Sequence, residues 1–318
     1  MYYLGIDVGS VSTDFVVMDE DRQIVHQLYL KTMGNPTAVL KEGMRKLDRR
    51  YLNEQIAGVG VTGSGRALAS AIVGADVIKN EITTHAIAAA AIDPDIRTII
   101  EIGGQDSKII LLEDGMVKDF AMNTVCAAGT GSFLDRQAER LGLKIDAIGE
   151  YALRADSPIR IAGRCAVFAE SDLIHKQQLG CSMENIIAGM CKALVRNYLA
   201  NVAKGKQIMP KVCFQGGVAA NPGIKTAFEE ELGMDVFVPE YHKVMGAYGS
   251  AILAQKQAVR EGSFQTKFKG FEAVNYDVTS TAFECNDCSN HCEIVILTAS
   301  GKQIGCFADR CEKYQQGL

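Results

Sequence analysis

Two stretches of the sequence repeat one pattern 94 residues apart, and this repeat decides the fold. The first reads GIDVGSVST at residues 5–13 and continues as DFVVMDE through residue 20. The second reads EIGGQDSK at residues 101–108 and continues as IILLED through residue 114. Each copy joins an acidic residue, a glycine-containing turn, an apolar strand and an acidic turn. The repeat predicts two similar lobes, each opening with a β-hairpin whose glycine-rich turn points the same way.

Around the repeat, strand-like and helix-like stretches alternate. Runs rich in β-branched and aromatic residues predict strands at 2–8, 15–18, 23–29, 56–61, 98–102, 108–112, 211–215 and 235–238. Apolar residues at helical spacing predict a helix at 35–52, and small residues predict another at 85–92. Such alternation indicates an α/β fold. We expect one lobe to comprise residues 1–93 and 246–262, and the second lobe to comprise residues 94–245.

The composition is that of an ordinary globular protein. Of the 318 residues, 47% are hydrophobic and 22% are charged, and the formal net charge is −5. This acidic balance argues against a nucleic-acid partner held by bulk charge. No apolar run approaches the ~18 residues of a transmembrane helix. The start, MYYLGIDVGS, lacks the basic region of a signal peptide. We therefore expect a cytoplasmic protein that contacts no membrane.

Three glycine-rich turns offer the oriented donors that a phosphate chain needs. One such turn alone is more often only a turn, but three in this order, two of them inside a repeat, favour a nucleotide site. Carboxylates beside the turns can position Mg²⁺ through water molecules. The residues expected to bind the nucleotide are Gly9, Ser10, Ser12, Thr13, Gly103, Gly104, Gly216 and Gly217. The residues expected to act on Mg²⁺ and phosphate are Asp7, Glu101, Gln105 and Asp106.

These turns carry a resemblance. GIDVGSVST, EIGGQDSK and FQGGVAANPG (residues 214–223) resemble the two phosphate motifs and the adenosine motif of the actin, Hsp70 and sugar-kinase superfamily. The resemblance covers roughly residues 1–260 and implies two ribonuclease-H-like lobes with ATP and Mg²⁺ between them. No Walker A sequence is present, so a P-loop fold is disfavoured.

Two cysteines stand in unusual surroundings. Cys126 precedes a predicted helix that begins near Ser132, and Cys165 follows Arg164. A helix amino terminus and a neighbouring arginine both stabilise a thiolate. The alternative is that both are buried structural cysteines, which is a common fate of free cysteine. Cys181, Cys191 and Cys213 are assigned to that structural class.

The two cysteine segments carry a more specific resemblance. NTVCAAGTGSFLDRQAERLG (residues 123–142) and GRCAVFAESDLIHKQQLG (residues 163–180) resemble the signature segments of the 2-hydroxyacyl-CoA dehydratase activators and the benzoyl-CoA reductase ATPase subunits. The resemblance implies that Cys126 and Cys165 of each protomer ligate one [4Fe-4S] cluster shared across a homodimer. A twofold dimer supplies the four cysteines that such a cluster needs.

Five further cysteines lie close together near the end of the sequence. They are Cys285, Cys288, Cys292, Cys306 and Cys311, and they flank a predicted hairpin between 293–297 and 303–307. Thiolates so close in sequence repel one another unless a metal is present, so a metal site is favoured over a set of free thiols. Zn²⁺ and a second iron–sulfur cluster both suit the spacing, and the redox context slightly favours iron. We expect residues 263–318 to form a linker and a small cysteine-rich metal-binding module.

The implied function is an ATP-dependent, low-potential electron donor. By resemblance, the electron acceptor is an iron–sulfur dehydratase or reductase, or a protein with a double-cubane cluster, and ferredoxin or flavodoxin is the donor. Two alternatives remain open. One is a sugar or small-molecule kinase of the same superfamily, although no sugar-binding aspartate base is evident. The other is a non-catalytic ATP-binding regulator with a structural zinc module.

Overall fold

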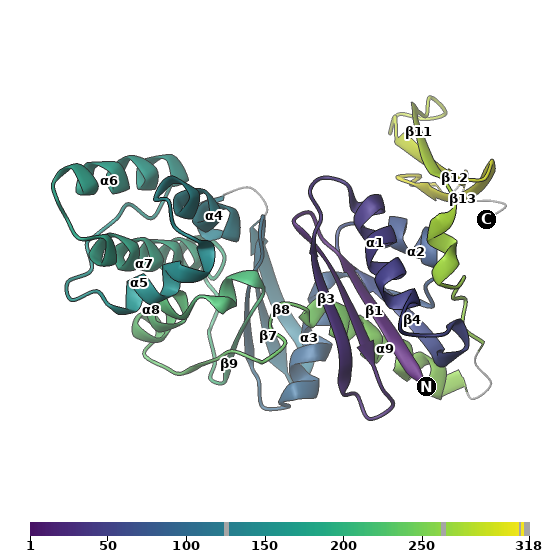
Figure 1. Ribbon diagram of the computed structural model, residues 1–318, viewed down its shortest axis with the longest axis horizontal. Helices are drawn as coiled ribbons and strands as arrows, with labels where there is room; N and C mark the ends of the chain where they lie inside the picture. The colour runs from purple at the N-terminus through teal and green to yellow at the C-terminus, as the bar shows by residue number, and fades with distance from the viewer. Residues whose placement is uncertain (124–126, 262–264, 312, 315–318) are drawn as a thin grey trace. The chain divides into compact units, whose positions relative to one another are not determined.

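The computed structural model describes residues 1–123, 127–261, 265–311 and 313–314 (Figure 1). It divides into two compact units. Unit 1 comprises Met1–Glu81 and Gly246–Leu318, and unit 2 comprises Ile82–Met245. Each unit contains a five-stranded mixed sheet with helices on its faces, so the expected α/β fold is confirmed. In the described part of the chain, no helix is long and apolar enough to cross a membrane.

The sheet of unit 1 has the strand order β3-β2-β1-β4-β5. The strands are β1 (Tyr2–Val8), β2 (Ser12–Met18), β3 (Ile24–Lys31), β4 (Ile56–Thr62) and β5 (Val77–Ile78). Helices α1 (Pro36–Asp48) and α2 (Arg66–Val73) cover the face that carries Phe15. Helix α9 (Met245–Glu261) covers the opposite face, where Gly5 and Gly60 admit its backbone (Figure 1). The core therefore lies on both sides of β1.

Helix α1 is shorter than the sequence predicts. Asn35 caps its amino end, because the side-chain oxygen accepts a hydrogen bond from the N–H of Ala38 at 3.0 Å. The helix ends at Asp48, where the chain tightens and the N–H of Arg50 donates to the carbonyl of Leu47, three residues earlier, at 2.8 Å. The expected last turn, through residue 52, is therefore a loop.

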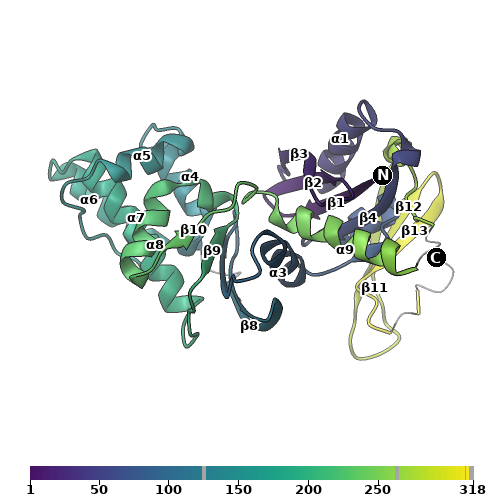
Figure 2. The same ribbon diagram turned by 90° about the horizontal axis from the view of Figure 1, so that it is seen from below.

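The sheet of unit 2 repeats the same order as β10-β9-β6-β7-β8. The strands are β6 (Thr98–Ile102), β7 (Ser107–Glu113), β8 (Met116–Asn123), β9 (Val212–Gln215) and β10 (Val236–Phe237). One face carries α3 (Glu81–Ile92), and the other carries the remaining helices (Figures 1 and 2). These are α4 (Gly131–Arg140), α5 (Ile148–Leu153), α6 (Ala166–Gln178), α7 (Met183–Asn201) and α8 (Pro222–Leu232). The rings of Tyr198, Phe214 and Phe228 pack edge-to-face in this core.

The internal repeat is confirmed down to its register. In unit 1, the β1–β2 hairpin pairs Asp7 with Asp14. In unit 2, the β6–β7 hairpin pairs Glu101 with Lys108. Both members of the second pair lie 94 positions after their counterparts in the first. The two hairpins therefore share one backbone arrangement and differ in the charges that they carry.

The C-terminal residues differ from the expectation of a linker and a separate module. Residues 271–275 form a 3₁₀ turn, and Phe271 and Val274 are buried in the core of unit 1. The N–H of Lys267 also donates to Asp76 of the same unit at 2.6 Å. A three-stranded sheet follows, composed of β11 (Val278–Glu284), β12 (Glu293–Ala299) and β13 (Lys302–Phe307). The predicted hairpin is thus present as β12–β13, but its sheet groups with unit 1.

Candidate functional site

The first glycine turn connects β1 to β2 and is braced from the end of β3. The N–H of Gly9 donates to the carbonyl of Ser12 at 2.8 Å. The hydroxyl of Thr32 donates to the carbonyl of Gly9 at 2.9 Å and lies 3.0 Å from the hydroxyl of Thr13. Ser10 is exposed in the same turn. Sequence reasoning selected the turn and missed Thr32, which holds it.

The carboxylate of Asp7 lies against two glycines. A Cβ on Gly63 would lie 2.5 Å from one oxygen of Asp7, and a Cβ on Gly246 would lie 2.0 Å from the other. Gly63 follows β4 and has φ +91°, a backbone conformation that favours glycine. Neither glycine was selected from the sequence. Both are required because they leave the space that the Asp7 side chain occupies.

Asp14 lies opposite Asp7 and is buried, with 5% of its surface exposed. The hydroxyl of Ser12 donates to one of its oxygens at 3.2 Å, while the other oxygen has no hydrogen-bond partner among the described residues. Burial, and then the charge of Asp7, raise the pKa of Asp14 well above its usual range, and the Ser12 hydrogen bond opposes this rise. Unit 1 therefore holds two facing carboxyl groups beside its glycine turn.

The second glycine turn is held by a buried lysine. The Nζ of Lys108 lies 2.9 Å from an oxygen of Glu101 and 2.9 Å from an oxygen of Asp106. Lys108 and Glu101 are 3% and 4% exposed. The N–H of Gly103 donates to the carbonyl of Asp106 at 3.0 Å, which closes the turn around the exposed Gln105. Lys108 is part of the EIGGQDSK motif, but the sequence analysis did not predict a role for it. Its position opposite Glu101 in the predicted hairpin was the signal that could have identified it.

Gly216 in unit 2 stands where Gly63 stands in unit 1. It follows β9, also has φ +91°, and its Cβ would lie 2.7 Å from the Glu101 carboxylate. The N–H of Gly216 donates to the carbonyl of His242 at 2.8 Å, and Gly217 begins a short 3₁₀ turn. Gly63 in unit 1 and Gly216 in unit 2 thus meet the same packing requirement, because each leaves space for a carboxylate side chain.

The second turn is hydrogen-bonded to the segment that follows Cys126. The N–H of Gly131 donates to the carbonyl of Gly103, and the N–H of Ser132 donates to the carbonyl of Gly104, both at 2.8 Å. The hydroxyl of Ser132 also donates to Gly104 at 2.5 Å. These bonds join the expected phosphate turn directly to the start of α4.

Of the two selected cysteines, Cys165 is described and Cys126 lies outside the described residues. Cys165 is the half-buried N-cap residue of α6. It lines a cavity of about 790 Å³ that also contains Arg160, Arg164 and Arg196. Cys165 therefore stands at a helix amino terminus, in a cavity that three arginine side chains also line.

The cysteines assigned to the structural class are buried or half-buried. Cys191 lies in α7 and Cys213 in β9, and burial raises the pKa of each thiol to about 12. Cys181 is half-buried and packs against the core of unit 2. A thiol that holds its proton so strongly is a poor nucleophile and a poor metal ligand.

The five C-terminal cysteines divide into two groups. Cys285 and Cys306 are buried in a small core with Ile294, and the half-buried Cys292 packs against it. Cys288 and Cys311 are exposed. Across the residues that the structure describes, no group of three or more His, Cys, Asp or Glu side chains is arranged to hold a metal ion.

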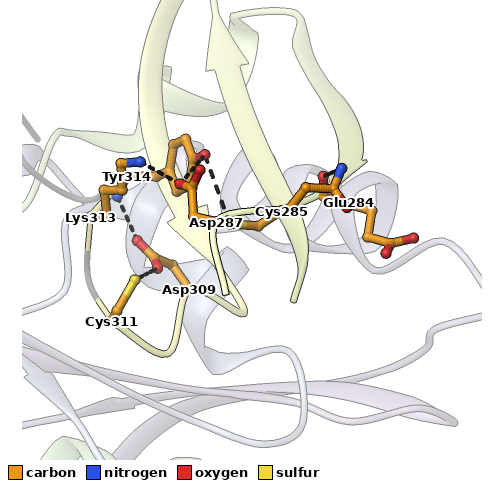
Figure 3. A network of polar contacts seen from close by, with 8 residues as sticks. Glu284, Cys285, Asp287, Asp309, Cys311, Lys313 and Tyr314 are labelled. Atoms are coloured by element: carbon orange, nitrogen blue, oxygen red, sulfur yellow. Dashed lines mark hydrogen bonds and ion pairs between the residues drawn. The ribbon is translucent and has the colours of Figure 1, made fainter. Parts of the chain in front are cut away.

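A polar network closes over this small core (Figure 3). The hydroxyl of Tyr314 reaches the sulfur of Cys285 at 3.9 Å, and Lys313 pairs with Asp287. Asp309 accepts hydrogen bonds from the thiol of Cys311 at 3.3 Å and from the N–H of Tyr314 at 2.6 Å. Residues 309–311 and 313–314 thereby lie close to Cys285 and Asp287.

Comparison with known proteins places the chain. The BadF/BadG/BcrA/BcrD ATPase family model matches residues 4–254. The (R)-2-hydroxyglutaryl-CoA dehydratase activating ATPase of Acidaminococcus fermentans is 34% identical, covering 82% of this chain and 99% of that protein. The activator of lactoyl-CoA dehydratase of Anaerotignum propionicum is 36% identical, covering 82% of this chain and 100% of that protein.

A solved structure agrees with these sequence matches. The activator of the 2-hydroxyisocaproyl-CoA dehydratase from Clostridium difficile, with bound ADPNP, is 33% identical and superposes with a TM-score of 0.75. The match covers 82% of this chain and 97% of the other. The resemblance carried by the two cysteine segments is therefore confirmed. This chain belongs to the BadF/BadG/BcrA/BcrD ATPase family.

Proposed function

We propose that this chain is an ATP-dependent electron donor that activates a partner iron–sulfur enzyme. The relatives named above are called activators or activating ATPases of 2-hydroxyacyl-CoA dehydratases. We infer a partner of that class, or a reductase or double-cubane cluster protein of similar chemistry. Ferredoxin or flavodoxin is the proposed electron source, and a homodimer is the proposed working form.

One observation carries the proposal. The carbonyls of Gly103 and Gly104, in the expected phosphate turn, accept hydrogen bonds from Gly131 and Ser132. Gly131 lies only five residues after Cys126. A displacement of the turn by nucleotide would therefore act on the segment that follows Cys126 through two backbone hydrogen bonds. This is the physical connection that an ATP-driven electron donor needs between its two sites.

The two glycine turns are the proposed nucleotide-binding elements. In the turn at Gly9, Ser10, Ser12 and Thr13, the exposed Ser10 is proposed to meet phosphate, because the N–H of Gly9 and the hydroxyls of Ser12 and Thr13 are bonded within the unit. In the turn at Gly103 and Gly104, Gly104 is proposed to meet phosphate, because the N–H of Gly103 already donates to Asp106. Asp7 and Asp106 are the carboxylates proposed to orient the water shell of Mg²⁺. When bound, Mg-ATP supplies the free energy of binding and hydrolysis. Glu101 contributes mainly by holding Lys108, which fixes the position of Asp106.

Cys126 and Cys165 are the proposed ligands of the [4Fe-4S] cluster. Cys165 fits a thiolate ligand because it caps the amino end of α6 and shares its cavity with three arginines. When bound, the cluster supplies a site that accepts and releases one electron. The arginines favour negative charge beside Cys165, and α6 directs its terminal N–H groups toward the same place.

The C-terminal cysteines remain a proposed metal site. Cys285, Cys292 and Cys306 already share one small core, and the exposed Cys288 and Cys311 lie on the segments that flank it. Iron and zinc are the two candidates.

We also propose that residues 94–245 act as the lobe that carries the cluster cysteines.

Metal analysis after anaerobic purification tests the proposal. We expect about two irons per protomer at the shared site, because one four-iron cluster serves two protomers. The Cys165→Ala and Cys126→Ala variants should lose this iron. Cys181→Ala is the matched control, because Cys181 is also half-buried in unit 2, and it should retain the iron.

The metal content of the same preparations identifies the metal at the C-terminal cysteines. It also shows whether the proposed function must be rejected. About six irons per protomer would place a second cluster at the C-terminal cysteines, whereas two irons with one zinc would place zinc there. A strictly anaerobic preparation without iron would rule out the electron-donor function. Iron that persists in both Cys126→Ala and Cys165→Ala would rule out these ligands.

A further inference from the structure

We propose that Asn197, on helix α7, is the positioning residue that holds both cysteine segments against one helix. The inference rests on the proposed function, because it concerns the spacing of the cysteines at 126 and 165. Asn197 is 2% exposed and lies in the core-facing side of α7. Its two amide atoms face the two different segments.

The amide nitrogen holds the segment that leads into Cys165. Its Nδ2 donates to the carbonyl of Gly163 at 2.5 Å and approaches the carbonyl of Arg164 at 3.3 Å. The fit is close, because a Cβ on Gly163 would lie 2.9 Å from the carbonyl oxygen of Ala193, one helical turn before Asn197. The segment before Cys165 therefore rests directly on the backbone of α7.

The amide oxygen faces the segment that follows Cys126. A Cβ on Gly129 would lie 2.9 Å from the Oδ1 of Asn197 and 4.0 Å from the backbone nitrogen of Tyr198. This oxygen is buried and has no hydrogen-bond partner among the described residues. Burying an amide oxygen without a partner is unfavourable, so stability alone does not account for an asparagine here.

The two contacts make α7 a common platform. The segment after Cys126 continues from Gly129 to Gly131, whose N–H binds the carbonyl of Gly103 in the second glycine turn. The segment before Cys165 is further held by Arg196, which donates to the carbonyl of Ile161 at 2.9 Å. Both segments lie against the side chain of Asn197. Its role is to keep the segment that follows Cys126 and the segment that precedes Cys165 at a fixed separation on α7.

Hydrogen exchange on the metal-free full-length chain tests the contacts themselves. In Asn197→Ala, we expect amide exchange about tenfold faster or more in both segments, at 127–132 and at 161–166. Asn197→Asp keeps the side-chain shape and removes the donor, so the segment at 161–166 should loosen more than the other. Asn201→Ala is the matched control, because the exposed Asn201 lines the same cavity one turn later and bonds only the backbone of Asn197. Exchange unchanged in either segment of Asn197→Ala overturns the proposal.

Spectroscopy of the iron-loaded chain tests the consequence. We expect Asn197→Ala to lose iron to a chelator about tenfold faster than wild type and to show an altered electron paramagnetic resonance spectrum when reduced, with the KM for ATP unchanged. A purely structural role would lower the melting temperature and leave the spectrum as in wild type, which would contradict the proposal. Wild-type protein without iron would contradict the proposed function. The exchange experiment would still test whether Asn197 holds the two segments.

Discussion

The two glycine-turn hairpins share a backbone and oppose each other in charge. Asp7 faces Asp14 in unit 1, whereas Glu101 faces Lys108 in unit 2. In both, a glycine with φ +91° after the neighbouring parallel strand makes room for the first carboxylate. The carboxylate of Glu101 is neutralised by Lys108 of its own unit, whereas Asp14 lies opposite a second carboxylate. One duplicated backbone therefore supports a buried ion pair in one copy and two facing carboxyl groups in the other.

Removing the cation of unit 2 should have the largest effect. Lys108→Met leaves Glu101 buried beside Asp106 without its partner, and breaking one side of a buried ion pair costs about 3–5 kcal/mol. We expect this loss in the free energy of unfolding, measured by urea denaturation. Lys118→Met is the control, because Lys118 forms an exposed pair with Glu113 on the same sheet at 2.9 Å, and its loss should change the free energy of unfolding much less. Equal losses in the two variants would remove the contrast between the hairpins.

Neutralising the second carboxyl of unit 1 should have a smaller effect of the opposite sign. The folded-state pKa of Asp14 is raised, so the folded chain keeps a proton that the unfolded chain releases above about pH 4. Stability should therefore fall as pH rises from about 4 through the folded pKa. Asp14→Asn removes this loss and should therefore be more stable than wild type at pH 7.

The measurement is urea denaturation from pH 4 to pH 8 in buffer without Mg²⁺ or nucleotide. The stabilities of Asp14→Asn and wild type should converge near pH 4 and separate as pH rises. Asp21→Asn, in the exposed turn after the same hairpin, is the control and should follow wild type throughout. A constant difference between Asp14→Asn and wild type at every pH would show that ionisation is not its cause.

The sequence predicted the hairpins better than it predicted their contacts. The repeat revealed both turns, because glycines and alternating strand residues leave a local signal. It also aligned Asp14 with Lys108, but their opposite roles depend on burial, which is a property of packing. Gly63, Gly246 and Asn197 were missed for the same reason, since each matters through a neighbour that is distant in the sequence.

The C-terminal segment shows the same limit. Residues 265–275 lack periodicity, yet Phe271 and Val274 complete the core of unit 1. Single buried side chains in an irregular segment leave no pattern to read. The β12–β13 hairpin, by contrast, was predicted from two apolar runs around Ser300-Gly301.

The braces of the two turns differ as well, and this difference should give the smallest effect. The first glycine turn depends on a side chain, because the Thr32 hydroxyl contacts both Gly9 and Thr13. The second glycine turn depends in part on the backbone, because the N–H of Ser132 donates to the carbonyl of Gly104, as does the Ser132 hydroxyl. Thr32→Val should therefore cost about 1–2 kcal/mol, since it removes the partner of the buried Thr13 hydroxyl and of the half-buried Gly9 carbonyl, and Ser132→Ala should cost about 0.5 kcal/mol. Nucleotide affinity, measured by calorimetry, should fall more in Thr32→Val. A larger fall in Ser132→Ala would mean that the second turn, rather than the first, is limited by its side-chain brace.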